Sequence, residues 1–307
     1  MADKTPDETF SKPLRLASRK SALAMKQAEM VQALLAPAES DIIGLTSLGD
    51  QVLDRPLADI GGKGLFVKTL EAALLEGRAD LAVHSMKDME TSLADGTCIA
   101  AVLPREDRRD ALLGAQSLND LPDGARVGTA SVRRAAFLRH HRPDLQIGLL
   151  RGNLQTRLAK LEAGEHDAII LAVAGLKRLG IANGWTALDE TEMRPAAGQG
   201  IIAIQARTDN PALLARLAAL NCADTADCAT AERAVLAALD GSCRTPISAN
   251  ADITGDAIEL YAALLSNDGR ELFEGRQKGP RSEAARLGQQ LGEDLLAACG
   301  GPDFLRG

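Results

Sequence analysis

The sequence predicts an α/β protein made of two similar lobes with mixed, mostly parallel sheets, followed by a small α+β domain. Between residues 14 and 220, short apolar segments alternate with segments of helical periodicity, a pattern typical of parallel strands joined by helices. Two motifs of the first half recur in the second half, which indicates two related lobes. After residue 222 the pattern changes to a helix, three strand-like segments and a final helix, which is typical of an α+β domain.

The composition argues against several classes of function. The chain has 307 residues and a formal net charge of −7, which disfavours general binding to the phosphate backbone of nucleic acids. Aromatic residues make up only 2%, too few for recognition of single strands by base stacking. Apolar runs of about 18 residues are absent, and the polar residues 1–12 lack the apolar core of a signal peptide. We therefore expect a cytoplasmic protein that binds neither nucleic acid nor membrane.

The five cysteines and four histidines show no metal-binding pattern. The cysteine count is odd, and the spacings match no zinc motif. His140 and His141 are adjacent, so on a helix they would point in different directions. We expect reduced thiols and no metal site. Cys243 differs from the other cysteines because it lies in a Gly/Ser/Pro turn at 240–246, where a thiol is more exposed and reactive than in an apolar core.

The first lobe begins with a strand and a helix joined by a polar turn. Ser18, Arg19 and Ser21 stand just before the helix, where free N–H groups and the helix dipole favour an anion. Ordinary capping of the helix by serine explains these residues equally well. The apolar face of the helix is expected to contain Leu23, Met30, Val31, Leu34 and Leu35. The elements predicted for this lobe are strands at 14–18, 42–48, 81–83 and 98–103 and helices at 21–36 and 65–76.

Residues 49–64 predict a long loop, in which Gly61, Gly62 and Gly64 supply hinges and Lys63 supplies a cation. Loops of this length in a compact domain are usually lids, binding loops or disordered segments. The glycine spacing does not match that of a P-loop, so we expect no nucleotide site there.

A polar segment follows the short strand at 81–83. His84, Ser85, Lys87 and Asp88 stand where that strand ends, and in an open α/β sheet ligands bind at this edge. Lys87 beside Asp88 is a candidate acid/base pair, in which the ammonium keeps the carboxylate ionised. The alternative is a solvated loop.

The second lobe repeats the order of the first after a charged crossing at 104–110. The first repeat is a strand followed by hydroxyl residues, arginines and a helix, which occurs at 16–19 and again at 127–134. The second is a helix followed by a glycine, an aspartate and a strand, which occurs at Gly77/Asp80 and again at Gly164/Asp167. Two similar lobes imply a cleft between them, a favoured place for ligands. The elements predicted for this lobe are strands at 126–128, 146–150 and 167–171 and helices at 131–140, 153–163 and 172–179.

Arginine is concentrated in the second lobe. Residues 126–157 contain seven arginines and a single acidic residue, Asp144. Arginine suits a bidentate grip on carboxylates or phosphates, so this segment predicts a small polyanionic ligand. We favour anion binding for Arg133, Arg134, Arg151 and Arg157 and solvated helix faces for Arg139 and Arg142.

A return crossing at 195–200 leads back to the first lobe, where a strand at 201–206 and a helix at 210–220 are predicted. The polar, alanine-rich segment 222–230 is a plausible boundary. Beyond it we expect a helix at 231–239, strands at 247–253, 257–265 and 271–277, and a last helix at 282–298. The predicted domains are residues 13–103 with 199–221, residues 104–198, and residues 222–307.

Taken together, these segments resemble the porphobilinogen deaminase (hydroxymethylbilane synthase) family over nearly the whole chain. The segments that carry the resemblance are LASRKSALA, GDQVLDRPLADIGGKGLFVKTLE, LAVHSMKDM, VGTASVRRAAFL, LRGNLQTRLAKL, DAIILAVAGLKRLG, PAAGQG and AERAVLAALDGSCRTPI. The resemblance implies two lobes like those of periplasmic binding proteins and a small α+β domain. It also implies a cytoplasmic monomer that joins four porphobilinogen molecules head to tail into hydroxymethylbilane, with loss of four ammonia, in tetrapyrrole biosynthesis.

The resemblance also implies roles for individual residues. Cys243 matches the cysteine that holds a dipyrromethane cofactor by a thioether bond, and Asp88 matches the catalytic aspartate. Each pyrrole carries an acetate and a propionate, which explains the arginine cluster. A carboxylate at Asp88 would stabilise the cationic azafulvene left by loss of ammonia. The residues implied to bind cofactor or substrate are Arg19, Ser21, Lys63, Phe66, Lys87, Thr129, Ser131, Arg133, Arg134, Arg151, Gly152, Asn153, Arg157 and Gln199.

Two positions depart from the family pattern. The family commonly has a serine where this chain has Ala130, so one hydroxyl contact is missing or is replaced by backbone. A basic residue of the loop is replaced by Asp59, which puts one charge contact in doubt. The competing interpretation is a two-lobed solute-binding or sensor protein for a carboxylate ligand, in which a domain with Cys243 would have no purpose.

Overall fold

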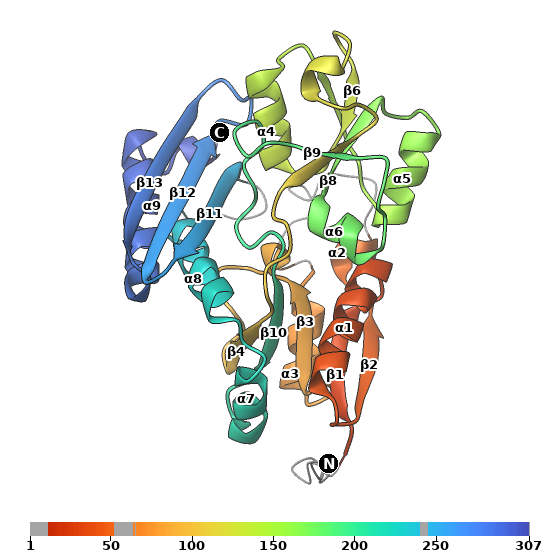
Figure 1. Cartoon of the computed structure of the whole chain (residues 1–307), viewed down its shortest axis with the longest axis vertical. Coiled ribbons are helices and arrows are strands. Elements are labelled where there is room, and N and C mark those ends of the chain that lie inside the picture. The colour runs from red at the N-terminus through yellow and green to blue at the C-terminus, as the bar shows by residue number, and fades with distance from the viewer. Residues whose placement is uncertain (1–11, 52–63, 65, 240–244, 307) are drawn as a thin grey trace.

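The computed structural model describes residues 12–51, 64, 66–239 and 245–306. Its described strands form three sheets, two with five strands and one with three. In Figure 1 the first lobe lies at the bottom, the second lobe at the upper right and the C-terminal unit at the upper left. The chain passes from the first lobe to the second and returns, so each lobe contains a strand that belongs to a crossing.

The first lobe has the strand order β2-β1-β3-β10-β4. β1 is parallel to β2 and β3, whereas β10 is antiparallel to β3 and β4. The strands are β1 (Leu14–Arg19), β2 (Ser40–Leu45), β3 (Leu81–Ser85), β4 (Thr97–Val102) and β10 (Ile202–Arg207). The helices are α1 (Ala22–Leu35), α2 (Leu48–Gln51), α3 (Lys68–Leu75), α7 (Pro211–Ala218) and the 3₁₀ turn η2 (Met86–Asp88).

The second lobe has the order β7-β6-β8-β5-β9, which repeats that of the first lobe strand for strand. β6 is parallel to β7 and β8, and β5 is antiparallel to β8 and β9. The strands are β5 (Asp110–Leu113), β6 (Arg126–Gly128), β7 (Gln146–Gly148), β8 (Ala168–Ala172) and β9 (Thr186–Ala187). The helices are α4 (Val132–His141), α5 (Leu154–Glu162), α6 (Val173–Arg178) and the 3₁₀ turn η3 (Leu118–Asp120).

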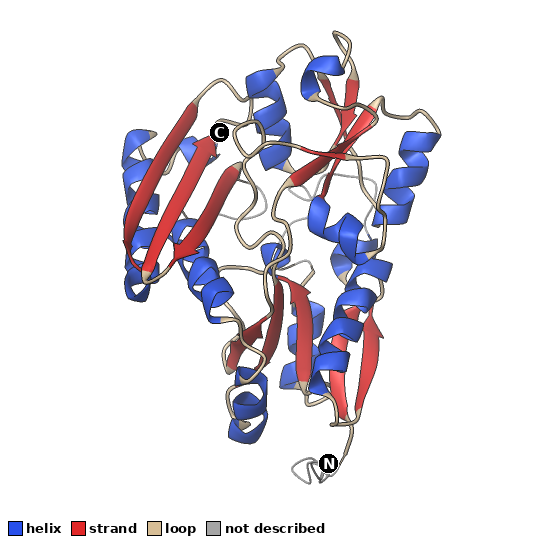
Figure 2. Ribbon diagram, in the orientation of Figure 1, coloured by secondary structure: helices blue, strands red, loops and turns tan. Residues whose placement is uncertain are grey.

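The C-terminal unit is a three-stranded antiparallel sheet covered by two helices (Figure 2). The helices approach closely, because a side chain at Gly288 would collide with the carbonyl of Ala231 and one at Gly292 with Ala238. The strands are β11 (Ile247–Thr254), β12 (Ala257–Leu265) and β13 (Leu272–Pro280). The helices are α8 (Ala223–Ala238), α9 (Ala284–Ala298) and the 3₁₀ turns η4 (Arg281–Glu283) and η5 (Phe304–Arg306).

Mixed sheets in both lobes and an α+β unit at the C-terminus confirm the predicted fold class. Parallel pairs do not predominate, however, because the crossing strand in each lobe runs against its two neighbours. The sequence pattern missed β5 and β9, which have four and two residues and are too short to show a period.

Two further details differ from the expectations. The helix predicted at 231–239 begins earlier, at Ala223, so that the segment 222–230 lies largely within α8. On α1, Met30 and Leu34 are exposed, and the buried face contains Ala24, Gln27, Ala28, Val31 and Leu35 instead. The small residues on that face let the helix lie close to the sheet, so the larger side chains at its edge stay outside.

The C-terminal unit shares a core with the second lobe. Ala263 and Leu265 of β12 are buried in the same cluster as Phe137 and Leu138 of α4. Ion pairs add to this contact, since Arg108 from the first crossing bonds both Glu190 and Asp252.

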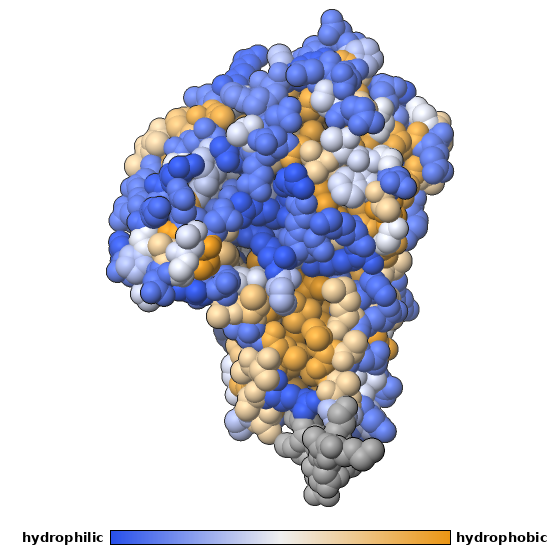
Figure 3. Space-filling view, viewed as in Figure 1, coloured by the Kyte–Doolittle hydropathy of each residue, from blue (hydrophilic) through white to orange (hydrophobic). Residues whose placement is uncertain are grey.

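On the face shown in Figure 3, hydrophilic residues cover most of the upper half, and apolar residues gather below, over the sheet of the first lobe. None of the helices in the described part of the chain has the length and apolar character that a membrane span requires.

Candidate active site

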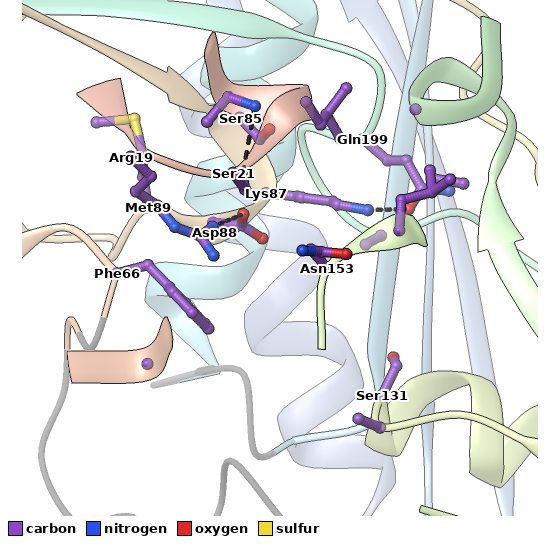
Figure 4. Close-up of a pocket in the computed structure, with 18 of the residues that line it drawn as sticks. Arg19, Ser21, Phe66, Ser85, Lys87, Asp88, Met89, Ser131, Asn153 and Gln199 are labelled. Carbon is purple, nitrogen blue, oxygen red and sulfur yellow. Dashed lines mark hydrogen bonds and ion pairs between the residues drawn. The ribbon is translucent and has the colours of Figure 1, made fainter. Parts of the chain in front are cut away.

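A cavity of about 550 Å³ lies between the two lobes and the C-terminal unit. The first lobe contributes Arg19 and the η2 turn, the second lobe contributes the starts of α4 and α5, and the third unit contributes Leu236, Thr245 and Ile247. Except for Ser18, His84 and Thr129, every residue that the sequence analysis singled out for binding or catalysis and that the structure describes lines this cavity (Figure 4). Lys63, Asp59 and Cys243 lie outside the described residues.

The η2 turn directs Lys87 and Asp88 into the cavity. β3 ends at Ser85, and the single 3₁₀ turn that follows is held by the buried side chains of Met86 and Met89. His84 does not line the cavity, since its side chain is buried. Burial lowers the pKa of His84 to about 4, so its imidazole is neutral near pH 7.

Arg19 stands between two carboxylates. Its Nη1 lies 3.6 Å from Oδ2 of Asp88, while its Nε donates to Oδ2 of Asp50 at 3.1 Å. The guanidinium also lies over the ring of Phe66, with Cζ 4.2 Å from the centroid. Burial opposes the charge of Asp50, but hydrogen bonds from Arg19 and Ser47 outweigh it and lower the pKa of that carboxyl. The sequence analysis missed Asp50 because an acidic residue at the start of a long loop carries no signal of its own.

Three helix N-termini face the cavity, and each is capped by a residue that lines it. Ser21 accepts the amide N–H of Ala24 in α1, Ser131 that of Arg134 in α4, and Asn153 that of Thr156 in α5. Capping is thus observed for all three residues. The positive ends of three helix dipoles nevertheless converge on one cavity, which favours negatively charged ligands there. Thr129 lies behind this surface and accepts the N–H of Ser131.

Arg133 and Arg134 share one buried carboxylate, that of Asp110. Nη2 of Arg133 donates to Oδ2 at 2.7 Å, and Nε and Nη2 of Arg134 donate to Oδ1 at 3.1 and 2.7 Å. Burial opposes the charge of Asp110, but the two guanidiniums outweigh it and hold the pKa of this carboxyl well below its usual range. The only sequence signal for Asp110 was its place between a charged run and the apolar residues Ala111 to Leu113, and the analysis did not use it.

Lys87 is connected to this cluster through Gln199. Its Nζ donates to Oε1 of Gln199 at 3.2 Å (Figure 4). Nε2 of Gln199 in turn donates to Oδ1 of Asp110 at 2.9 Å. Burial and, to a lesser extent, repulsion by the positive charge of Arg134 lower the pKa of Lys87 to about 8. The hydrogen bonds therefore join residues of both lobes and of the return crossing.

Arg151 and Arg157 complete the positive lining. Nη2 of Arg151 donates to the carbonyl of Gly49 at 3.1 Å, which links the two lobes. Nε of Arg157 donates to the carbonyl of Gly152 at 2.9 Å. Gly152 has a φ of 112°, which only glycine adopts readily, and this turn starts α5. Burial lowers the pKa of Arg157 to about 10, and the nearby Arg134 contributes further.

Gln27 is a further lining residue that the sequence analysis did not single out. Its Nε2 donates to the hydroxyl of Ser85 at 2.9 Å. Its position on the otherwise apolar buried face of α1 was the available signal, because a polar side chain there needs a partner.

The cavity fits a small group that bears several carboxylates. Its volume is within the range of cavities that hold small ligands, about 300–1,000 Å³. Within the described part of the chain, Nε of Arg133 is buried and has no hydrogen-bond partner. An unpaired donor of this kind, beside other guanidiniums and three helix N-termini, suits a carboxylate oxygen.

Comparison with known proteins identifies the family. The family model described as the dipyromethane cofactor binding domain of porphobilinogen deaminase matches residues 14–215, and that of the C-terminal domain of the same enzyme matches residues 226–297. A curated porphobilinogen deaminase from Nitrobacter hamburgensis is 47% identical over 294 residues, which cover 93% of this chain and 93% of that protein.

Solved structures show only remote likeness. The periplasmic VFT2 domain of Bordetella pertussis BvgS has 16% identity and a TM-score of 0.39, over 67% of this chain and 85% of that chain. The periplasmic aliphatic sulphonate binding protein SsuA from Escherichia coli has 15% identity and a TM-score of 0.40, over 75% and 71%. The family assignment does not depend on these two structures. Because the matching models and the curated relative span most of the sequence, the chain belongs to the porphobilinogen deaminase family.

Proposed function

We propose that this protein is a transferase that condenses four porphobilinogen molecules head to tail into hydroxymethylbilane, with release of four ammonia, in tetrapyrrole biosynthesis. The observation that carries the proposal is the position of Asp88 in a cavity lined by arginines of both lobes and by Thr245, which follows Cys243 by two positions in the sequence. The family membership supports the same reaction. A simple carboxylate-binding protein would have no use for the third unit at this cavity.

The basic residues bind and orient the acid side chains of the substrate. Arg19, Arg151 and Arg157 line the cavity from both lobes, and the N-termini of α1, α4 and α5 add positive potential. Because each pyrrole brings two carboxylates, the site must neutralise more charge as the product lengthens. Guanidiniums suit this task because they stay charged and bind carboxylates with two hydrogen bonds.

Asp88 has two tasks in this reaction. When the C–N bond of the substrate aminomethyl group breaks, ammonia leaves and positive charge develops on the methylene carbon, which a nearby carboxylate stabilises. A new C–C bond then forms to the ring position being substituted, and the proton lost from that carbon needs an acceptor. The Asp88 side chain is about one-third exposed and lies in the cavity, so it can reach both the departing amine and that proton.

Cys243 is proposed to hold a dipyrromethane cofactor through a thioether bond. When bound, this group supplies the pyrrole to which the first substrate is added. The residues near it in the sequence, Leu236, Thr245 and Ile247, line the cavity, and the guanidiniums above suit its carboxylates. A thioether rather than an ester or disulfide suits a primer that must survive many turnovers.

We also infer the organisation of the molecule. The three domains are residues 13–103 with 199–221, residues 104–198, and residues 222–307, each containing one of the three sheets. We further infer a monomer that works in the cytoplasm, as the resemblance to the porphobilinogen deaminase family implies. Light scattering of the purified protein tests the monomer, and fractionation of the source cells tests the compartment.

The intact mass of freshly purified protein tests the proposed function. We expect the mass of the bare chain plus two pyrrole units, and colour with acid p-dimethylaminobenzaldehyde. Cys243→Ser is expected to show the bare mass and no colour, whereas the matched variant Cys98→Ser keeps the adduct. A wild-type protein that shows only the bare chain, even after incubation with porphobilinogen, would overturn the proposal.

A further inference from the structure

Asp110 is a buried carboxylate that neither the sequence analysis nor the proposed reaction uses. It stands at the start of β5, directly after the first crossing, and has 0% exposure. Its two oxygens accept hydrogen bonds from Arg133, Arg134 and Gln199. A buried carboxylate with several charged donors is stable only if their geometry is well defined, so the cluster is a fixed part of the cavity wall.

The cluster connects parts of the chain that are distant in sequence. Arg133 and Arg134 begin α4 in the second lobe, Gln199 lies in the return crossing, and Lys87 lies in the η2 turn of the first lobe. Gln199 accepts from Lys87 with its carbonyl oxygen and donates to Asp110 and to the carbonyl of Arg108 with its amide nitrogen. Only this orientation of the amide satisfies all three groups, so the lysine is held at a defined place.

We propose that Asp110 is a positioning residue for the reaction: it fixes the guanidiniums of Arg133 and Arg134 and, through Gln199, the ammonium of Lys87, before substrate arrives. The proposal rests on the proposed function, since it names the group that organises the carboxylate-binding side of the same cavity. Cations that are already in place need no reorganisation when a carboxylate binds, which makes their electrostatic effect larger.

The hydrogen bonds give the two arginines different tasks. Arg134 uses Nε and Nη2 on Asp110 and Nη1 on the carbonyl of Ile170, so each of its nitrogens is already engaged. It acts on the ligand mainly as a fixed positive charge. Arg133 uses Nη2 on Asp110 and Nη1 on the carbonyl of Arg194, whereas its Nε has no partner within the described part of the chain. Arg133 therefore keeps one N–H group that no described residue uses, whereas Arg134 keeps none.

Charge balance shows why one carboxylate is needed here. Two consecutive arginines, each about 5% exposed or less, would repel each other in a buried place without an anion between them. Lys87 faces the same two guanidiniums from the first lobe. Two negative charges also act on its ammonium: Asp88, which lies on the same η2 turn, and Asp110 across the cavity wall. Loss of the Asp110 charge would leave Lys87 beside two guanidiniums and one carboxylate, and its ammonium would become easier to deprotonate.

The test is a titration of Lys87 in the cofactor-loaded protein by NMR of ¹³C-labelled lysine side chains, with the signal assigned by Lys87→Arg. In Asp110→Asn we expect the pKa of Lys87 to fall by about one pH unit or more, the effect of removing a unit charge within several ångströms. The alkaline limb of kcat/KM moves to lower pH by the same amount. The matched control is Asp144→Asn, which removes the carboxylate of an Arg–Asp pair at the other end of α4 and leaves the titration unchanged.

A folded Asp110→Asn protein in which Lys87 titrates as in the wild type would overturn the proposal. If this variant does not fold, Gln199→Met replaces it. It keeps the ion pairs of Asp110 with Arg133 and Arg134 and removes the hydrogen bonds through which Gln199 connects Lys87 to Asp110 and to the carbonyl of Arg108. The pKa of Lys87 must then also fall, and an unchanged value would overturn the proposal. The titration needs no turnover, so its result is separate from the intact mass that tests the proposed function.

Discussion

Nη1 of Arg19 lies 3.6 Å from Oδ2 of Asp88, yet Arg19 makes its shorter hydrogen bonds to Asp50. The guanidinium is therefore shared, and its contact with Asp88 is an ion pair without a hydrogen bond. Because Asp50 holds Arg19, the Asp88 carboxylate keeps an oxygen exposed to the cavity. This arrangement places beside the cavity a carboxylate whose charge is only partly offset by Arg19, which is what stabilisation of a cationic reaction centre requires.

Asp88→Asn is expected to lower kcat by roughly a thousandfold with the cofactor still attached. A carboxylate at about 4 Å from a unit positive charge contributes about 4 kcal/mol at an effective dielectric near 20, and the amide keeps the shape but loses the charge. Steady-state kinetics and the intact mass of the same sample measure both properties. Glu76→Gln, which removes a carboxylate of an exposed ion pair, serves as the control. Near-normal turnover in Asp88→Asn would exclude this role.

Arg157→Met is expected to raise the KM for porphobilinogen roughly tenfold to a hundredfold, with a smaller effect on kcat. Its Nε is held by Gly152, and the described residues place no carboxylate within ion-pair distance of it, so its remaining N–H groups are available to the ligand. A hydrogen bond to a charged group contributes about 1.5–3 kcal/mol. Arg286→Met removes an exposed arginine on α9 and should leave KM unchanged. An unaltered KM in Arg157→Met would show that this arginine has a structural role only.

Glu232→Gln is expected to lower the free energy of unfolding by about 3–5 kcal/mol. The carboxylate is fully buried and accepts from Arg105, from the N–H of Gly198 and from the N–H of Ala251, so it joins both crossings to the C-terminal unit. An amide has one acceptor oxygen and would turn N–H groups toward some of these donors. Urea unfolding measures the change, with Glu259→Gln at an exposed pair as the control. A loss below about 1 kcal/mol, as typical of surface pairs, would contradict this account.

Stability is expected to fall between about pH 6.5 and pH 4 because of His84. The folded protein holds the pKa of this histidine at about 4, below its ordinary value of 6.5, since burial disfavours the charged form. The unfolded chain therefore binds more protons in this interval. The contribution of neutral His84 to stability is complete above pH 6.5, the pKa of histidine in the unfolded chain. It is lost as the pH falls toward the pKa of His84 in the folded protein, by about 3 kcal/mol in total. Urea unfolding at pH 7 and pH 4.5 measures it, and an equal loss in His84→Leu would assign the effect to other groups.

Local residue patterns predicted most elements because each depends on neighbours in sequence. The strand at Leu81 to Val83 and the helices that begin after Ser21, Ser131 and Asn153 all occur, with those residues as caps. The pattern failed where the outcome depended on distant contacts. The short strand β5 is stabilised by pairing with β8 and β9, and the residues of 222–230 are helical because α8 packs on α9 and on β11.

Sequence alone determined that the molecule would contain two repeated α/β lobes with arginines at the starts of helices, because periodicity, caps and charge are properties of adjacent residues. It also indicated Asp88 by its position at a strand end. Only the tertiary structure decided which groups meet: that Asp110 lies between Arg133 and Arg134, that Asp50 shares Arg19 with Asp88, and that Gln199 connects Lys87 to the opposite lobe. These contacts join residues up to 112 positions apart. The packing of the sheets and crossings decides which distant residues meet, and a local sequence pattern contains no information about that packing.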